Sequence, residues 1–592
     1  MKKYLFIALA ALGFAACAEK VDDTNVPKGE LEESYIAINL MAADVDTRAP
    51  LDEYGGFEDG TALERAVKKA YFFFFDENGN PFNVTAEKES PATGPNHAQS
   101  GVNHLSLNIT NQNPAASSLP NVSDIKNAVL ILNTYKGVYP SKIVAVINWT
   151  PTLDKAYTLA ELHAVMDNSI GNDTDGYVMS NSVYMDGAGN VVDAVPLTAA
   201  NIKTTQEAAK ADPVDIYVER TAAKVVLTAS KKIEGVQNKI LFDTQKKSKP
   251  VLNAGTSSEI DVYVNLNGWE LYNDYSTSTL LKNIDKWQVE DLGLTWNDIP
   301  YYRCYWANSQ SNQLDDKFAW SYSNEDLSSL GFKTQWGFKI ATKYTEAPSI
   351  RYDDGTYTYC GENTNQKIGS IDPRTKVILK GQLMQKNGEN YEPLELARWY
   401  GTEYAGNEAL RIAVANSLKY TLYYYDETNR KYISIDPDDL ICVEGTEVNA
   451  EAYEVGFQLT TNAEKKTWYQ YSSSEGYKVF GDNSVEGDNA VKANEYLMTV
   501  EPALLYASGQ TYYIVDIKHL GKKDTPSEYG IVRNHVYQID IESIKGYGSP
   551  VYNGSSNLEN PEYPEVSESS YVAARINVLS WKVVKQGVDI VQ

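Results

Sequence analysis

Residues 215–230, DIYVERTAAKVVLTAS, are the stretch that decides the class of fold. β-branched and aromatic side chains recur through it without a glycine or proline, which is typical of one long β-strand. Segments of the same character lie on both sides of it: residues 70–82, 128–137, 142–150, 176–192, 259–274, 375–384, 510–520, 530–544 and 569–592. Few segments resemble helices that would join parallel strands. The pattern therefore predicts a mainly β protein, built mainly of antiparallel sheet.

Two local signals add detail. Asn78-Gly79, near the end of the first of these runs, is a strong signal for a hairpin turn. Thr158 and Glu161 have the spacing of a capping box, in which each side chain bonds the other residue's backbone N–H. A short helix is therefore expected over residues 157–166.

The length of the chain points to more than one domain. A chain of 592 residues is too long for a single hydrophobic core. Its character changes near residue 280, where loops rich in Trp, Tyr, Asn and Ser follow. We therefore predict two β-sandwich domains in tandem, residues 49–278 and 279–592. Residues 407–418 have helical spacing and would decorate the second domain, in which residues 420–435 would form a hairpin.

The amino terminus predicts export. Two lysines precede an apolar run that is too short to span a bilayer, so residues 1–16 are interpreted as a secretory signal peptide. The stretch FAAC, which ends at Cys17, resembles a bacterial lipobox, in which the cysteine becomes lipidated. Cys17 is thus the candidate lipidation site, and residues 17–48 would be a lipidated propeptide held to outer-membrane lipid. The alternative is an ordinary signal peptide with a chance cysteine.

A short predicted strand precedes an isolated arginine. Ile36, Ile38 and Leu40 alternate and would share one face of a strand. Arg48, the first arginine of the chain, follows them, and Ala49 opens a stretch that looks like the beginning of a domain. The simplest explanation of this arginine is an exposed residue in a linker.

The sequence carries no recognisable motif for catalysis or cofactor binding. A P-loop, a dinucleotide-binding glycine motif, H-E-x-x-H and G-x-S-x-G are all absent from it. No two of the five histidines have obvious metal-ligand spacing, and His535 is interpreted as structural. Two Asp/Asn/Gly-rich runs, 75–82 and 185–192, lack the twelve-residue calcium loop and fit hairpin turns better. We expect no enzyme activity, cofactor or metal, and the formal net charge of −26 disfavours nucleic acid as a partner.

Three cysteines remain beyond the lipobox. Cys304, Cys360 and Cys442 fit no zinc motif. One disulfide can form in an oxidising compartment, with Cys304 and Cys360 as the candidate pair, while three buried thiols are the alternative.

Seven stretches together resemble the type V pilins of the Bacteroidales, the fimbrillin lipoproteins. In order, they are FAAC (14–17), VMSNSVYMDG (178–187), IYVERTAAKVVL (216–227), YYRCYWA (301–307), YTYCGENTN (357–365), YGIVRNHVYQIDIESIKGYGSPVY (529–552) and INVLSWKVVKQGVDI (576–590). The resemblance depends on their order and spacing and covers essentially the whole chain. Within the family, it is strongest to the major subunit of the short (minor) fimbriae.

The resemblance implies a fold, a processing route and a function. The two domains would be transthyretin-like β-sandwiches, and the precursor would reach the outer membrane as a lipoprotein. A surface protease with arginine specificity would cut between Arg48 and Ala49 and release the leader strand. The mature chain would then be a shaft subunit of a cell-surface fimbrium that supports adhesion. Its partners would be identical or related pilin subunits joined head to tail, with anchor and tip pilins at the ends.

Donor-strand exchange of this kind requires a second strand that can replace the leader strand. Residues 576–583 are expected to complete their own domain. The alternation then changes phase, and Val584, Val588 and Ile590 would form the donor strand within a tail of residues 584–592.

Three other functions are alternatives to this one. A surface lipoprotein that binds glycans would share the lipobox, the β-sandwiches and the aromatic residues. A tip or anchor pilin would lack either the donor tail or the cleavable leader. An enzyme such as a glycosidase is disfavoured, since no group of residues points to one.

Overall fold

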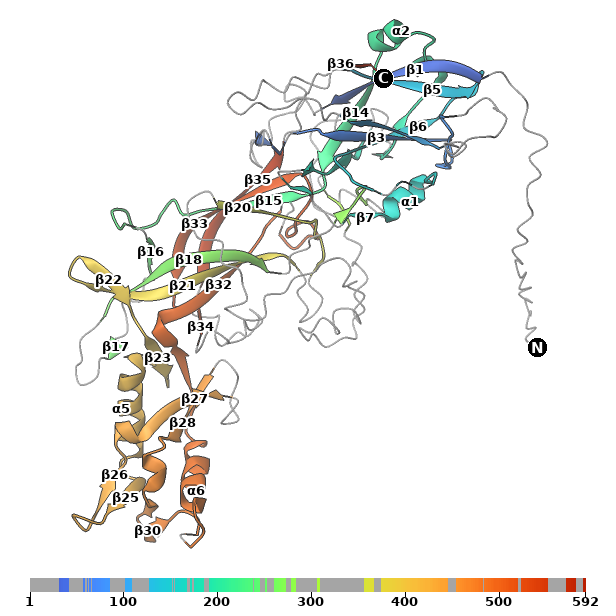
Figure 1. Ribbon diagram of the computed structural model, residues 1–592. Coiled ribbons are helices and arrows are strands. Elements are labelled where there is room, and N and C mark those ends of the chain that lie inside the picture. Colours follow the sequence, from blue (N-terminus) through green and yellow to red (C-terminus); the bar gives the residue numbers. More distant parts are fainter. Residues whose placement is uncertain are drawn as a thin grey trace, which may run out of the picture.

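The structure is a computed structural model of the chain. It describes residues 31–41, 57–58, 61, 63–64, 66–85, 102–108, 127–151, 153, 155–167, 171–172, 175–185, 191–237, 239–244, 251–252, 260–272, 278–283, 306–308, 356–366, 374–445, 454–482, 484–519, 523–551, 571–581 and 589–591. These residues form three units that follow one another along an elongated molecule (Figure 1).

The first unit is a nine-stranded sheet. Along the sheet its strands are β36 (Asp589–Val591), β5 (Asn127–Tyr135), β1 (Leu31–Met41), β14 (Val214–Arg220), β10 (Met179–Asn181), β6 (Lys142–Ile147), β3 (Lys69–Phe75) and β4 (His104–Asn108), with β13 (Val195–Pro196) paired to β6. Both faces are buried around β3. Phe72 and Phe74 pack into one core cluster, and Phe73 and Phe75 into another. This two-sided burial explains a strand with four consecutive phenylalanines.

The second unit is a β-sandwich. One sheet contains β2 (Phe57–Glu58), β35 (Tyr571–Trp581), β33 (His535–Lys545), β15 (Ala223–Thr228) and β20 (Thr356–Cys360). The other contains β16 (Ile240–Asp243), β18 (Val262–Tyr272), β21 (Lys376–Asn387), β32 (Gln510–Asp516) and β34 (Ser549–Pro550), with β22 (Asn390–Pro393) paired to β21. A single core lies between them, to which Val225 and Ile539 contribute from the first sheet and Val264 and Leu379 from the second.

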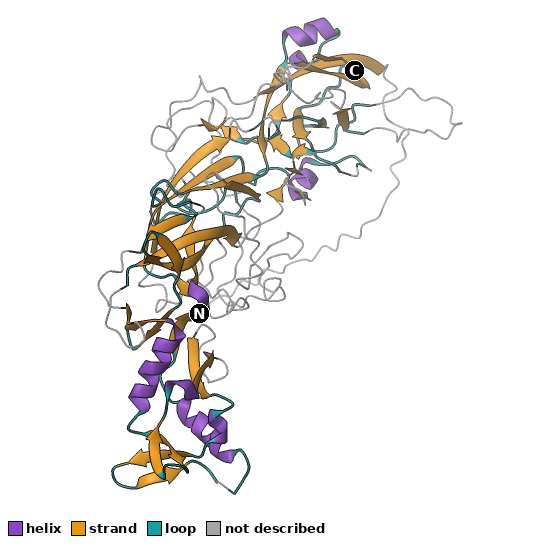
Figure 2. Ribbon diagram, turned by 60° about the vertical axis from the view of Figure 1, so that its left-hand side comes forward, coloured by secondary structure: helices purple, strands orange, loops and turns teal. Residues whose placement is uncertain are grey.

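The third unit, residues 394–506, is here called the distal lobe. Its first sheet contains β24 (Thr402–Ala405), β23 (Leu396–Trp399), β31 (Ala503–Tyr506), β28 (Glu454–Leu459) and β27 (Leu440–Glu444), with β17 (Val251–Leu252) at the edge. Its second contains β26 (Lys431–Ser434), β25 (Leu422–Asp426), β29 (Trp468–Ser472) and β30 (Gly476–Val479). Helices α5 (Gly406–Leu418) and α6 (Asp488–Leu497) complete the lobe at the end remote from the nine-stranded sheet (Figure 2).

The remaining elements are short. They are α1 (Leu159–Ala164), α2 (Gln206–Ala211), the strand pairs β7 (Met166–Asp167) with β19 (Ser278–Thr279), β8 (Gly171–Asn172) with β9 (Gly176–Tyr177) and β11 (Tyr184–Met185) with β12 (Val191–Val192), and 3-10 turns at Ala199–Asn201, Pro437–Asp439, Ala463–Lys465 and Ala507–Gly509. The capping box predicted for the first helix is present. The Glu161 carboxylate accepts the Thr158 backbone N–H at 2.8 Å, and the Thr158 hydroxyl accepts the Glu161 backbone N–H at 3.0 Å.

The mainly β fold class and several local predictions are confirmed. The turn at Asn78-Gly79 forms, with Gly79 at a φ of +82° that favours glycine. The helix over 407–418 and the hairpin over 420–435 are present as α5 and as β25 with β26. The sheets are not purely antiparallel, however, because β14 pairs in parallel with β1 and β15 with β33. The separate distal lobe was not predicted.

The prediction of one long strand over residues 215–230 is wrong. The chain forms β14 in the first sheet, turns at Thr221 and Ala222, and continues as β15 in the sandwich. The physical reason is the burial of two charged side chains. Glu219 and Arg220 are buried at this point and bond to residues from other segments. The chain therefore passes from the nine-stranded sheet into the sandwich before the domain boundary that was predicted between residues 278 and 279.

Candidate functional site

The predicted leader strand, β1, lies inside the nine-stranded sheet rather than at its edge. Residues 31–38 pair antiparallel with β5, and residues 38–41 pair in parallel with β14. Ile36 and Ile38 have 0% exposure and pack in the core of that sheet, as the alternation predicted. Leu40 lies opposite Ile216 in the register, and its side chain is outside the described residues. The first described strand is therefore an integral part of the hydrophobic core.

A short loop and helix hold the other edge of β1. The backbone N–H of Tyr35 donates to the carbonyl of Lys203, and the Lys203 N–H donates back, both at 2.8 Å. Just beyond, α2 begins at the N-cap Thr205, and its buried Ala209 packs against Ala37 of β1. At Tyr35, the predicted leader strand thus bonds to backbone on both sides, although β14 pairs only with residues 38–41.

The site of predicted processing lies beyond this strand. Arg48 and Ala49 fall between β1 and β2 in the sequence and outside the described residues. Cys17 also lies outside them. Cleavage at Arg48 and lipidation at Cys17 therefore stay predictions.

The carboxyl-terminal segment has two structural environments. Residues 571–581 form β35, which pairs antiparallel with β33 and completes its own sheet. Residues 589–591 form β36, which pairs in parallel with β5 on the side of β5 opposite to β1. Ile590 lies opposite Ala128 in this register, whereas Val584 and Val588 are outside the described residues. Figure 1 shows the C-terminus beside β1 and β5.

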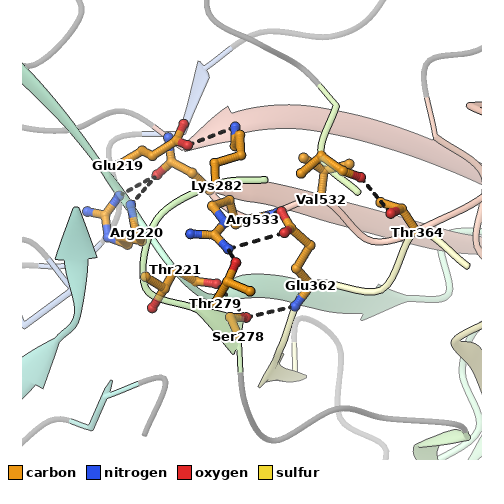
Figure 3. Close-up of polar contacts among 12 residues, drawn as sticks. Glu219, Arg220, Thr221, Ser278, Thr279, Lys282, Glu362, Thr364, Val532 and Arg533 are labelled. Carbon is orange, nitrogen blue, oxygen red and sulfur yellow. Dashed lines mark hydrogen bonds and ion pairs between the residues drawn. The ribbon is translucent and has the colours of Figure 1, made fainter. Parts of the chain in front are cut away.

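A cluster of buried charges lies where the first sheet meets the sandwich (Figure 3). The ammonium group of Lys282 lies 2.7 Å from a carboxylate oxygen of Glu219, and both side chains are at most 2% exposed. Lys224 is paired with Glu64 at 3.0 Å, with both side chains buried. Because a buried charge is costly unless paired, each pair must form together with the surrounding fold. We call this cluster the buried junction.

Arg533 forms the most connected part of the buried junction (Figure 3). Its guanidinium group donates to both carboxylate oxygens of Glu362, at 3.1 and 3.2 Å. It also donates to the Thr279 hydroxyl at 2.7 Å and the Leu280 carbonyl at 3.2 Å. Such a two-pronged contact fixes orientation as well as distance. Arg533 therefore joins three segments that are far apart in the sequence.

Arg220 and Glu64 extend the junction to the first unit. Arg220 Nε donates to the Glu64 backbone carbonyl at 2.8 Å, and the Tyr359 hydroxyl donates to the Glu64 carboxylate. Burial raises the pKa of Glu64, but hydrogen bonds from Tyr359, the Thr61 N–H and Lys224 outweigh it, so that the pKa lies below its usual range. Glu64 is therefore an ionised, buried carboxylate.

Four of the stretches that carry the fimbrillin resemblance meet at the buried junction. Residues 178–187 contribute Ser182, which donates to Glu219 at 3.2 Å. The other contributions are Glu219, Arg220 and Lys224 from 216–227, Tyr359 and Glu362 from 357–365, and Arg533 and Asn534 from 529–552. The sequence gives one signal for this cluster: charged residues that interrupt apolar strand runs. The buried junction was not predicted.

Several other residues that the sequence analysis singled out lie among the described residues. Cys360 is buried at the end of β20, and Cys304 is outside the described residues, so their pairing stays a prediction. Burial raises the pKa of the Cys442 thiol to about 12. His535 is buried, with Nδ1 2.8 Å from the Arg533 carbonyl, which fits a structural role. The Asp76 carboxylate accepts two backbone N–H groups of its own turn.

Neither metal nor membrane features emerge from the described part of the chain. Within it, no three His, Cys, Asp or Glu residues are grouped so as to hold a metal ion. Among those same residues, no helix is long and apolar enough to cross a membrane.

Residues 504–587 match the family described as "Major fimbrial subunit protein type IV, Fimbrillin, C-terminal". The matched segment runs from β31 to beyond β35 and includes Arg533 of the buried junction. The resemblance to fimbrillins inferred from the sequence is thus confirmed over this segment, which is similar to the C-terminal region of fimbrillins. No curated protein matches the chain.

Solved structures of low sequence identity are also similar. A fimbrilin from Porphyromonas gingivalis W83 is 13% identical, with 93% of this chain and 98% of that chain covered and a TM-score of 0.36. A cell adhesion protein from Bacteroides eggerthii, so described in its structure, is 11% identical, with coverages of 94% and 98% and a TM-score of 0.33. The tip fimbrial protein Mfa3 from Porphyromonas gingivalis is 10% identical, with coverages of 93% and 100% and a TM-score of 0.25. Similarity at this level carries no functional inference.

Proposed function

We propose that this protein is a structural subunit of a cell-surface fimbrium that polymerises by proteolysis-triggered strand exchange and supports adhesion. The observation that carries the proposal is the place of β1, an interior strand followed in the sequence by Arg48. Its two described isoleucines are fully buried, so the strand contributes to the core although it precedes the predicted cleavage point. The match of residues 504–587 to fimbrillins supports the same class of function.

Loss of β1 would create a receptor for another strand. It would uncover the apolar row of Leu130 and Leu132 on β5 and Ile216 on β14, and it would leave two strand edges unpaired. Fully burying an isoleucine is worth roughly 1.5–3 kcal/mol, so the open groove is unstable in water. A replacement strand restores both the apolar contacts and the ladder.

The tail supplies the replacement strand in this proposal. β35 ends at Trp581, so residues 584–592 follow the last strand of their own sheet. Residues 589–591 already form a strand against β5. A tail that enters the groove of the next subunit makes a head-to-tail contact, which does not close on itself and therefore builds a filament. Val584, Val588 and Ile590 are the side chains proposed to fill that groove.

The processing route is part of the proposal. The precursor is exported, lipidated at Cys17 and held at the outer membrane, and an arginine-specific surface protease cuts between Arg48 and Ala49. Identical or related subunits, with anchor and tip pilins at the ends, are the partners. A shaft position requires both a cleavable leader and a donor tail. We propose no catalytic activity for the chain.

The first experiment is to identify the amino-terminal residue of the protein recovered from the cell surface, by mass spectrometry. Ala49 is expected, and Arg48→Ala should leave an uncleaved, monomeric protein. Arg430→Ala is the matched control, because Arg430 is an exposed arginine in the turn between β25 and β26. A mature protein that retains Cys17 through Arg48 would contradict the proposal and favour an anchor pilin or a monomeric glycan-binding lipoprotein.

A further inference from the structure

One hydroxyl group of β1 is buried without a bonding partner. Ser34 is 2% exposed, and within the described part of the chain its side-chain oxygen makes no hydrogen bond. A hydroxyl that is buried in this way costs free energy, because the bond that it makes to water in the open state is not replaced. Ser34 therefore weakens the hold of β1 on the sheet, whereas Ile36 and Ile38 strengthen it.

Ser34 lies on the face of β1 that packs into the core. The antiparallel register places it opposite Leu132 of β5 and places Ile36 opposite Leu130. Because side chains two residues apart point to the same face of a sheet, Ser34 shares the row of Ile36 and Ile38. Leu130 and Leu132 are 0% exposed and belong to the core cluster of that face. An aliphatic side chain would suit this position better than serine does.

The position lies in the middle of a ladder and not at its end. Residues 31–38 of β1 pair with β5, and Ser34 is central in that run. On the other edge of β1, the neighbouring Tyr35 exchanges two hydrogen bonds with the backbone of Lys203, both at 2.8 Å. Fraying of the strand at its ends therefore cannot return the Ser34 hydroxyl to water. The cost persists for as long as β1 is in place.

Cleavage after Arg48 changes what this cost does. Before cleavage, the chain that follows β1 tethers the strand to its own groove, at a high effective concentration. After a cut between Arg48 and Ala49, β1 is held by its own contacts alone. A cost that the tethered strand tolerates then becomes a higher rate of departure.

We propose that Ser34 makes β1 a temporary occupant of the sheet, because its buried hydroxyl speeds the release of the strand once Arg48 has been cut. The inference rests on the proposed function, in which β1 is the leader strand, and it adds a residue that regulates the exchange. The isoleucines keep the precursor closed, and the serine lets the cut leader leave the groove to a partner strand.

The test follows release of the leader from the full precursor. The purified protein is cut by limited digestion with an arginine-specific protease, and mass spectrometry identifies the product cut after Arg48. Native mass spectrometry then measures, over time, the fraction of this product that still holds the leader. Ser34→Ala removes the unpartnered hydroxyl, so its leader should dissociate at least about fivefold more slowly than that of the wild type. Ile36→Ala removes a buried side chain from the same row and should speed dissociation.

The matched control is Ser106→Ala, the same chemical change at an exposed position of β4 in the same sheet. It should release the leader at the wild-type rate. The inference is overturned if Ser34→Ala releases its leader as fast as Ser106→Ala while Ile36→Ala releases it faster, since the hydroxyl then carries no cost. A cut wild-type protein that never releases its leader, or an Ile36→Ala variant that behaves like wild type, would instead contradict the proposed function, because β1 would not be a removable strand.

Discussion

Ile38 of β1 and Val214 of β14 lie side by side in parallel register, within the interior of the nine-stranded sheet. On its other side, Ile38 pairs with Ala128 of β5. A strand near the start of the chain thus joins two strands that would otherwise be separated. Whatever removes β1 must break a ladder on each side, which is why its removal can act as a switch between a closed subunit and one open to a partner strand.

Weakening the buried face of β1 should loosen β5 before cleavage occurs. In the uncleaved Arg48→Ala protein, Ile36→Ala with Ile38→Ala removes two fully buried side chains, at about 2–5 kcal/mol each. Hydrogen exchange of the β5 amides, followed by mass spectrometry, should become faster. Lys136→Ala, at an exposed position just after β5, is the control. Unchanged protection of β5 would show that β1 does not stabilise the sheet.

Removal of residues 584–592 should abolish polymerisation without unfolding the subunit. β35 ends at Trp581, and its pairing with β33 is complete without the tail. The cleaved, truncated protein should therefore elute as a monomer in size-exclusion chromatography, with a melting temperature lowered only slightly by loss of the short pairing between β36 and β5. A variant that lacks only Gln592 should still form filaments in electron micrographs. Filaments from the truncated protein would rule out the tail as the donor strand.

The buried pair of Lys282 and Glu219 predicts a large, non-additive effect on stability. Lys282→Met should lower the free energy of unfolding by about 3–5 kcal/mol, because it leaves the Glu219 carboxylate buried without its partner. The double variant with Glu219→Gln should recover part of this loss. Thermal denaturation followed by circular dichroism measures both. Lys478→Met, which disrupts only an exposed pair with Glu475, should change little. Equal losses in the single and double variants would contradict the pairing.

The Glu64 carboxylate predicts an acid-sensitive junction. Since its folded pKa lies below that of an unfolded glutamate, about 4.3, its stabilising effect is present above that pH and is lost as the pH falls through the folded pKa. The melting temperature of wild type should therefore fall more steeply below about pH 4.3 than that of Glu64→Gln. Glu475→Gln, at an exposed site, should follow the wild-type curve. Parallel curves for Glu64→Gln and wild type would show that this carboxylate is not the sensitive group.

Local sequence signals predicted local structure well and long-range structure poorly. The capping box of Thr158 and the turn at Gly79 depend on a few neighbouring residues, and both are present. The parallel pairing of Ile38 with Val214 depends on partners far apart in the chain, which alternation alone does not specify. The break after Arg220 has the same cause, since the side chain bonds to the carbonyl of Glu64, a residue distant in sequence.

The distal lobe was not predicted, for a related reason. Its strands look like those of a sandwich one by one, and α5 alone was expected as a surface decoration. Its separate core becomes visible only when Leu410 of α5, Phe457 of β28 and Leu497 of α6 are seen in one cluster.

The candidate disulfide between Cys304 and Cys360 is the last prediction. Cys360 is buried opposite Ala223, beside the segment that carries Glu362 of the buried junction, so a bridge there would brace the junction. Non-reducing digestion and mass spectrometry of the exported protein should yield the linked peptides. Cys360→Ser should lower the stability by about 2–5 kcal/mol. Cys442→Ser, at a buried thiol 3.2 Å from the side-chain oxygen of Asn407, is the control and should leave the linked peptide intact. Recovery of Cys360 in reduced form from the cell surface would show that its burial, rather than a bridge, accounts for this cysteine.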